Sequence, residues 1–238
     1  MRSPRAILVD LDATLLDASG LPVALARTCA ALALAEPSLD AERLLAANQA
    51  AWSDYWPSAE REWQLGRLPG AALTREVWRR ALDTCGCSTE SVAYLAAQTH
   101  DEYARHALRL YEDVAEFFRV LRGHVPLGLV SNGAADTQRQ RLLWFDLEQH
   151  FDVIAISAEL GFAKPDPAIF RFALDKLGVI EDDVWHVGDS LSSDVAGARA
   201  AGIRTVWLNR FGVSRRPGDP KPDLEISSLT QVASAIRV

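Results

Sequence analysis

From residue 112 onward, helical patterns alternate with short apolar runs, and this alternation limits the possible folds more than any other feature of the chain. The apolar runs that we read as strands are 125–130, 153–156, 184–187 and 205–208. The helical patterns before, between and after them cover 114–122, 134–144, 166–177, 194–201 and 229–236. Strands joined by helices are typical of a parallel sheet with helices on both faces. We therefore expect an α/β fold, with one more buried strand at 6–9.

The segment 22–108 interrupts this alternation, because it is rich in alanine, helical in period and almost without strand signals. About four helices are expected, at 23–34, 40–56, 73–84 and 89–108, with a break at Pro57 and a further helical stretch at 60–65. A segment of this length is too long to be a loop. We expect a small helical domain over 18–111, inserted into a core made of 1–17 and 112–238.

Two carboxylates follow the first expected strand directly. Asp10 and Asp12 come after the apolar run, and Thr14 follows them. Side chains at positions i and i+2 of an extended segment leave from the same face, so the two carboxylates can share one small space. Two negative charges about 4 Å apart repel by ~4 kcal/mol at an effective dielectric of 20, and a magnesium ion would offset this repulsion. The alternative is a strand followed by an ordinary turn held by aspartate side chains.

Polar residues of other chemical types follow the later elements. Ser131 and Asn132 come after one expected strand, Asp189 and then Asp194 after another, and Lys164 precedes an expected helix. Taken singly, Ser131 and Asn132 suit a turn, Lys164 suits a solvated loop, and Asp194 suits a helix cap. Because the carboxyl ends of parallel strands meet at one edge of a sheet, the same residues can form one site.

Four short motifs in this order extend over nearly the whole chain. They are Asp10-Leu11-Asp12-Ala13-Thr14-Leu15, Val130-Ser131-Asn132-Gly133, Lys164-Pro165-Asp166-Pro167, and Gly188-Asp189-Ser190 with Asp194. Together they resemble the motifs of the haloacid dehalogenase-like hydrolase superfamily, which often has glycine or asparagine where this chain has Ala13. The resemblance implies a Rossmann-like core and a mobile cap, which is the helical insertion. The hinges between them would lie near 17–21 and 108–113.

The resemblance also implies roles for the carboxylates. Asp10 would be the nucleophile that forms an aspartyl-phosphate, and Asp12 would act as general acid and then as general base. Mg²⁺ would be held by Asp10, by the main-chain carbonyl of Asp12 and by Asp189. Asp194 would be a supporting carboxylate beside the metal.

The phosphate group of a substrate would be bound by Ser131, Asn132 and the backbone amides around them, with Lys164 offsetting its charge. Thr14 would orient the first loop by hydrogen bonding. His186 lies inside an apolar run and is expected to be a buried core histidine with its hydrogen bonds satisfied. The tryptophans of the insertion either line a substrate pocket or belong to its core, and they are Trp52, Trp56, Trp63 and Trp78.

Within this superfamily the residues favour a phosphatase that acts on a small phosphorylated metabolite. Asp12 argues against the haloacid dehalogenases, which lack this second carboxylate because no leaving oxygen needs a proton. A phosphonate-cleaving enzyme would need a lysine in the cap, whereas the three lysines of the chain are Lys164, Lys176 and Lys221. The alternatives are a phosphomutase of the β-phosphoglucomutase kind and a non-catalytic metabolite-binding module.

Composition limits the partners. A formal net charge of −7 argues against nucleic acid as the main partner. No apolar run reaches the ~18 residues of a membrane span, and the first residues lead directly into a strand rather than into a signal segment. The three cysteines lack metal-binding spacing, so we expect reduced thiols in a cytoplasmic protein. Nothing in the sequence specifies an oligomeric state or the identity of the metabolite.

Overall fold

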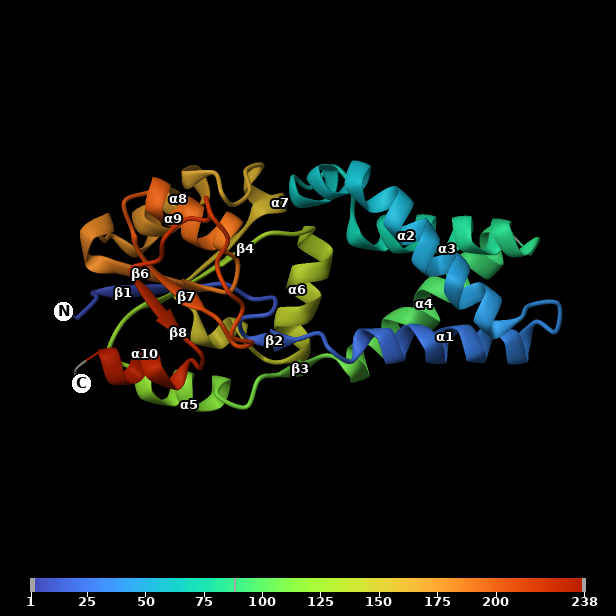
Figure 1. The fold of residues 1–238 in the computed structure, drawn as a ribbon, viewed down its shortest axis with the longest axis horizontal. Helices are drawn as coiled ribbons and strands as arrows, with labels where there is room; N and C mark the ends of the chain where they lie inside the picture. The colour runs from blue at the N-terminus through green and yellow to red at the C-terminus, as the bar shows by residue number, and fades with distance from the viewer. Residues whose placement is uncertain (1–2, 88, 237–238) are drawn as a thin grey trace.

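A six-stranded sheet forms the centre of the protein in a computed structural model that describes residues 3–87 and 89–236 (Figure 1). The strands are β1 (Ala6–Val9), β4 (Leu127–Ser131), β5 (Val153–Ile156), β6 (Val184–Gly188), β7 (Arg204–Leu208) and β8 (Leu224–Ile226). Their spatial order is β5-β4-β1-β6-β7-β8, and all neighbouring strands are parallel. The predicted α/β class is confirmed. β8 was not predicted, because its three residues are too few to give a recognisable apolar pattern.

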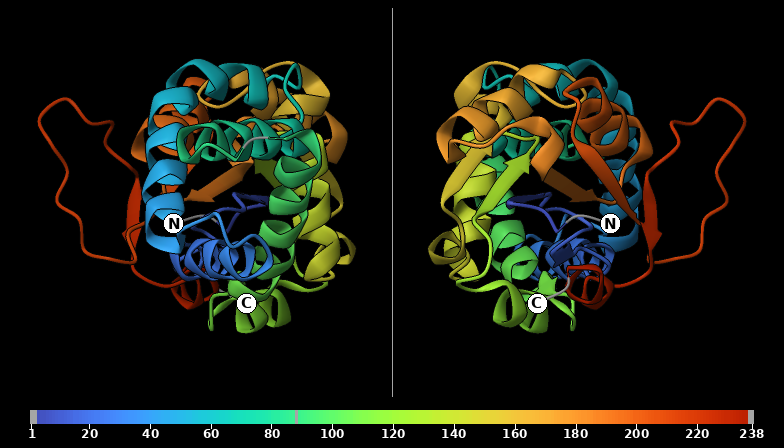
Figure 2. Two further views of the ribbon diagram at one scale, coloured as in Figure 1. Left: turned by 90° about the vertical axis from the view of Figure 1, so that its right-hand side faces the viewer. Right: turned by 90° about the vertical axis from the view of Figure 1, so that its left-hand side faces the viewer.

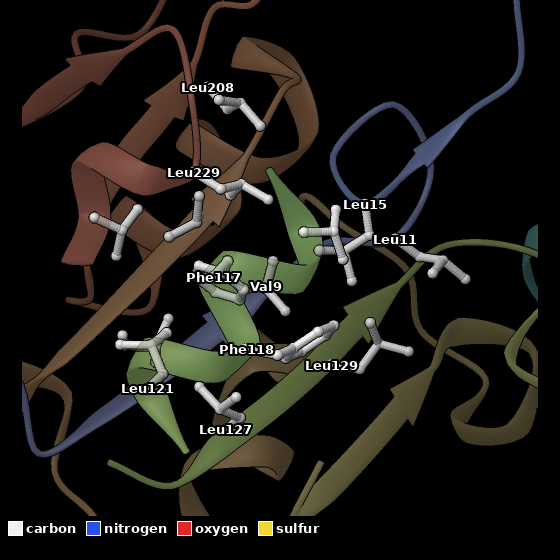
Figure 3. Packing of buried hydrophobic residues seen from close by; sticks show 14 of the residues in the cluster. Val9, Leu11, Leu15, Phe117, Phe118, Leu121, Leu127, Leu129, Leu208 and Leu229 are labelled. Atoms are coloured by element: carbon white, nitrogen blue, oxygen red, sulfur yellow. The ribbon is translucent and has the colours of Figure 1, made fainter. Parts of the chain in front are cut away.

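Helices cover both faces of the sheet, as the alternation predicts. One core cluster joins β1, β4, β6 and β7 to α5 (Val114–Leu121), α6 (Ala135–Trp144) and α10 (Thr230–Ala235) (Figure 3). The other cluster joins the sheet to α8 (Pro167–Leu177) and α9 (Ala196–Ala200). In β1, Ile7 and Val9 belong to the first cluster, and Ala6 and Leu8 to the second. The central strand is therefore buried on both faces, which explains why its sequence is a continuous apolar run.

The insertion forms a bundle with its own core. Its helices are α1 (Leu21–Ala35), α2 (Ala41–Gln64), α3 (Gly70–Cys85) and α4 (Glu90–Ala107), which lie together at one end of the molecule (Figure 1). Leu44, Trp78 and Leu82 are among the residues buried between them. The antiparallel pair β2 (Leu16–Asp17) and β3 (Arg109–Leu110) joins this cap to the sheet, close to the predicted hinges. The inserted helical cap is confirmed, while its division from the core at 18–111 stays a prediction.

The predicted helix break at Pro57 is wrong, because α2 runs unbroken from Ala41 to Gln64 with Pro57 inside it. A proline removes one backbone hydrogen bond and crowds the preceding turn, so it usually ends or kinks a helix. Here Leu44 and Ala47 before the proline and Ala59 after it are all buried. Tertiary packing on both sides of Pro57 thus outweighs the local cost.

Several shorter elements also differ from the sequence pattern. A helix expected over 194–201 begins with a π-helical turn, Leu191–Val195, followed by α9. The remaining elements are the short helix α7 (Ser157–Leu160) and two 3₁₀ turns, Glu148–His150 and Glu181–Asp183. Figure 2 shows the segment between β7 and β8 extending away from the body of the molecule. No helix within residues 3–87 and 89–236 is both long and apolar enough to cross a membrane.

Candidate active site

The order of the strands brings the polar strand ends together. β1 lies between β4 and β6, so the carboxyl ends of these three strands lie along one edge of the sheet. This edge carries Asp10 after β1, Ser131 at the end of β4 and Asp189 after β6. This is the carboxyl edge, where parallel α/β sheets usually bind ligands. Lys164, from the loop before α8, reaches the same edge and contacts Asp10.

Lys164 is buried between two carboxylates. Its Nζ donates to Asp10 Oδ1 at 2.5 Å, to Asp194 Oδ1 at 2.8 Å and to the main-chain oxygen of Val130 at 2.9 Å, which uses all three of its protons. Burial opposes the charge of this lysine, but the carboxylates of Asp10 and Asp194 hold its pKa above the ordinary value. With only 5% of its surface exposed, Lys164 is a charged group of the site, and the solvated-loop alternative is wrong.

Three carboxylates share this space with one lysine. One oxygen from each of Asp10, Asp189 and Asp194 lies within 4.8 Å of the other two. Burial, together with the charge of Asp194, raises the pKa of Asp189 to about 6. Burial also raises the pKa of Asp10, and it outweighs the opposing effect of Lys164. The site therefore holds more negative charge than its lysine offsets, and carboxylate oxygens at this spacing are the ligands that Mg²⁺ prefers.

Asp194 stabilises the site and does not cap the helix that it was expected to open. Its Oδ1 accepts from Lys164 and is 2.8 Å from His186 Nε2, and its Oδ2 accepts from the N–H of Ser190 at 3.1 Å. Although burial acts the other way, Lys164 and His186 lower the pKa of Asp194. Gly188 makes room for this carboxylate, because a Cβ at that position would lie 2.3 Å from Asp194 Cγ.

The residues predicted to bind phosphate lie next to this charge cluster. Thr14 Oγ1 donates to Asp10 Oδ2 at 3.3 Å and so orients the carboxylate. The side chain of Asn132 exchanges two hydrogen bonds with the backbone of Lys164, at 2.8 and 2.9 Å, which fixes the lysine loop to the end of β4. Ser131 is buried, and its Oγ accepts from Gln138. The structure brings these residues together, and their contacts with phosphate stay predictions.

The carboxylate of Asp12 is held by α6 rather than by the charge cluster. Its Oδ1 accepts from Arg141 Nη1 at 2.6 Å, and its Oδ2 accepts from Gln138 Nε2 at 2.9 Å. Among the described residues, this carboxylate is not part of the group that could bind a cation. That arrangement agrees with a metal role for the main-chain carbonyl of Asp12, which stays a prediction.

Three residues at the site were not identified from the sequence. His186 is buried, as expected, but only one of its ring nitrogens has the expected hydrogen bond: Nε2 pairs with Asp194, and Nδ1 has no partner in the described part of the chain. Burial lowers the pKa of the ring, which is therefore neutral and donates through Nε2. Gln138 and Arg141 lie more than 120 residues from Asp12 in sequence. Their spacing of three places them on one face of α6, but no local pattern shows what that face meets.

A family model described as haloacid dehalogenase-like hydrolase matches residues 4–202, which contain every residue of this site. The chain is a haloacid dehalogenase-like hydrolase. The phosphoserine phosphatase of Thermus thermophilus is 39% identical to this hydrolase over 159 residues, which are 66% of this chain and 62% of the relative. The N-acylneuraminate-9-phosphatase of Homo sapiens is 33% identical over 131 residues, or 55% of this chain and 53% of the relative. The matches thus span between half and two thirds of these relatives.

A solved structure extends the likeness over the cap as well as the core. The 2-haloacid dehalogenase of Pseudomonas syringae pv. tomato superposes on this hydrolase with a TM-score of 0.70 and 29% identity, covering 99% of this chain and 98% of the other. The resemblance drawn from the four motifs is therefore confirmed at the level of family and fold.

In this hydrolase Ser157 links the cap to Gly133, in the segment after β4. The hydroxyl of Ser157, at the start of α7, donates to the main-chain oxygen of Gln64 in the cap at 2.6 Å. The same hydroxyl accepts from the N–H of Gly133 at 2.9 Å. Beside it, the carboxylate of Asp136 accepts from the N–H groups of Gly70 and Ala71 at the start of α3. Core and cap are thus joined by three hydrogen bonds next to the site, one from Ser157 and two to Asp136.

Among the cap tryptophans the core role is confirmed for Trp78, and pocket lining stays a prediction for the others. Trp78 is 1% exposed and belongs to the core of the bundle. Trp63 is at the site side of the cap, because a Cβ at Gly133 would lie 2.7 Å from its ring. Trp56 contacts the Trp63 ring edge-on and stacks on Trp52, with ring centroids 5.4 and 5.0 Å apart. These three rings therefore lie in a row that reaches Gly133, in the segment after β4.

Replacing Ser157 with alanine is expected to lower the free energy of unfolding by about 1–3 kcal/mol, because it leaves the buried N–H of Gly133 without its acceptor. Urea denaturation measures the loss. Ser58→Ala is the matched control, since Ser58 is an exposed serine of α2 that also donates to a main-chain oxygen. The control should change stability by less than about 0.5 kcal/mol. If both variants lost the same free energy of unfolding, the Ser157 contact would contribute no more to stability than an exposed serine does.

Proposed function

We propose that this protein is a Mg²⁺-dependent phosphatase that hydrolyses a small phosphorylated metabolite through an aspartyl-phosphate. The observation that carries the proposal is the pairing of buried Asp10, held by Lys164, with a second carboxylate, Asp12, two residues later. A phosphatase that works through an aspartyl-phosphate needs one carboxylate to attack phosphorus and a second group to move protons. The two relatives described above are named as phosphatases, and this supports the same reaction class here.

The proposed reaction has two steps at one carboxylate. Asp10 attacks phosphorus while the bond to the leaving oxygen breaks, and Asp12 gives its proton to that oxygen. Water then attacks the phosphorus of the aspartyl-phosphate and loses a proton to Asp12, which releases inorganic phosphate and restores Asp10. Lys164, with the hydroxyl and amides around Ser131, would stabilise the negative oxygens in both steps.

The donor set fits a magnesium ion beside these groups. Asp10, Asp189 and the main-chain carbonyl of Asp12 would hold it, and Asp194 would support it from the buried side. When bound, the ion would neutralise charge on the phosphoryl oxygens and relieve the repulsion between the carboxylates. The rest of the chemistry is carried by side chains of this chain.

Phosphate release from a panel of phosphorylated metabolites, with Mg²⁺ and with EDTA, tests the proposal. Magnesium-dependent release is expected, and the preferred compound would identify the substrate class. If a folded protein released no phosphate from any compound, hydrolysis would be rejected. An isomerisation assay with hexose phosphates would then test the phosphomutase alternative, and equilibrium binding of the same panel would test the non-catalytic one.

The affinity for Mg²⁺ is expected to fall by about tenfold between pH 7 and pH 5. The pKa of Asp189 is raised to about 6 in the metal-free protein, so this carboxylate is mostly ionised at pH 7 and mostly protonated at pH 5, and a metal must displace the proton. Trp207, whose Nε1 donates to the main-chain oxygen of Asp189 at 2.7 Å, offers a fluorescence signal for the titration. Asp189→Asn should bind Mg²⁺ more weakly and with less dependence on pH. An unchanged wild-type affinity at pH 5 would contradict this role of Asp189.

A further inference from the structure

Asp12 is held by two residues that belong to none of the four motifs. Arg141 Nη1 donates to Asp12 Oδ1 at 2.6 Å, and Gln138 Nε2 donates to Asp12 Oδ2 at 2.9 Å. Both oxygens of the carboxylate therefore have a donor from the same helix, α6. Two donors on two oxygens fix the plane of a carboxylate and not only its position.

Gln138 connects this carboxylate to Ser131 and Asn132, which are predicted to bind phosphate. Its side chain is fully buried, and besides Asp12 its Nε2 lies 2.8 Å from Ser131 Oγ and 2.8 Å from the main-chain oxygen of Asn132. Two amide protons thus serve three acceptors in one small space. A movement of Gln138 would change the positions of Asp12 and Ser131 together.

Arg141 completes the network with a charge. The same Nη1 that donates to Asp12 also lies 3.2 Å from Oε1 of Gln138, so it fixes the orientation of the amide. Its side chain is 19% exposed and that of Asp12 is 38% exposed, so the pair lies at the mouth of the site rather than in the core. Without these contacts, a partly exposed aspartate would sample several rotamers.

We propose that Arg141 and Gln138 are positioning residues that hold Asp12 in one place for both of its proton transfers. The inference rests on the proposed function, because it assumes that Asp12 moves protons. In the first step Asp12 must meet the leaving oxygen, and in the second it must meet the attacking water at nearly the same position. A carboxylate held in one orientation serves both steps, whereas a displacement of about 1 Å can lower a rate by about 100-fold.

A different role for Arg141 makes a different kinetic prediction. If this arginine instead bound an anionic group of the substrate, its loss would raise KM and leave kcat nearly unchanged. If it positions Asp12, its loss lowers kcat and leaves KM within about threefold. In a variant whose residue 12 can no longer move protons, loss of Arg141 should have little further effect on kcat.

The test is a double-mutant cycle with p-nitrophenyl phosphate, whose good leaving group keeps the Asp12→Asn variant measurable while hydrolysis of the aspartyl-phosphate still needs Asp12 as a base. We expect Arg141→Met to lower kcat by about 10- to 100-fold in the wild-type background and by less than about twofold in the Asp12→Asn background. Gln138→Leu should also lower kcat, but part of its loss should persist in the Asp12→Asn background, because Gln138 also donates to Ser131 Oγ. Arg141→Lys should recover part of the loss, since it restores one charged donor. Circular dichroism of each variant separates a loss of function from a loss of fold.

Arg139→Met is the matched control. Arg139 lies on the same helix, two residues before Arg141, and pairs with Glu148 and Glu159 on the surface, so kcat should stay within twofold. Equal losses from Arg141→Met in both Asp12 backgrounds, or a change in KM alone, would overturn the positioning role while leaving the phosphatase intact. Absence of magnesium-dependent hydrolysis by the unmodified protein would instead overturn the proposed function.

Discussion

Replacing Asp10 with asparagine is expected to lower phosphatase turnover by at least about 10⁴-fold while the protein stays folded. An amide is nearly the same size as the carboxylate but cannot attack phosphorus to form an acyl phosphate, so the loss falls on the chemical step. The fold should survive because Lys164 keeps its contacts with Asp194 and with the main-chain oxygen of Val130. The substitution also removes one negative charge from a site in which three carboxylates face one lysine.

The measurement is phosphate release at saturating substrate and magnesium, together with a thermal melt of each protein. Asp175→Asn is the control, since Asp175 is an exposed aspartate on α8, and it should keep full turnover. An Asp10→Asn variant that melts like the wild type but retains more than about a tenth of its turnover would exclude Asp10 as the nucleophile. A variant that fails to fold would be replaced by Asp10→Ser, which removes the carboxylate with a small side chain.

The main elements of the core could be predicted because their signals are local. β1 and β5 have the predicted bounds, 6–9 and 153–156, since each is an apolar run between polar or turn-forming residues. Where tertiary packing determines the bounds or the existence of an element, the local sequence pattern does not predict it. α2 continues through Pro57 because both of its halves are packed against other parts of the cap, and within the described residues β8 pairs with β7 alone.

The same limit applies to the site. Asp10, Asp189 and Ser131 could be found because each comes directly after or at the end of an apolar run, and parallel strands place such positions at one edge. Gln138 and Arg141 could not be found, because they sit in the middle of a helix and meet Asp12 only through the fold. His186 could be predicted as buried, but its contact with Asp194 depends on the π-helical turn that carries the aspartate.

Removing divalent cations is expected to lower activity by about 100- to 1000-fold, which corresponds to several kcal/mol of transition-state stabilisation. The physical reason is the charge of the metal-free site. Asp10, Asp189 and Asp194 bring three carboxylates within 4.8 Å, and the pKa values of Asp10 and Asp189 are raised because burial and mutual repulsion disfavour their ionised forms. A doubly negative phosphate group would add to this repulsion, and Lys164 alone offsets only one charge.

EDTA treatment followed by addition of Mg²⁺ tests the metal requirement, with thermal stability as a second readout. Magnesium at about 100 times its dissociation constant should stabilise the wild-type protein by about 2.7 kcal/mol, because it binds only the folded state. Asp189→Asn is the matched variant: it removes one ligand charge, so the same magnesium concentration should restore less activity and raise the melting temperature less. If the wild-type protein kept full activity in EDTA, or melted identically with and without Mg²⁺, the carboxylates would form no magnesium site, and Lys164 would have to offset the charge of the phosphate alone.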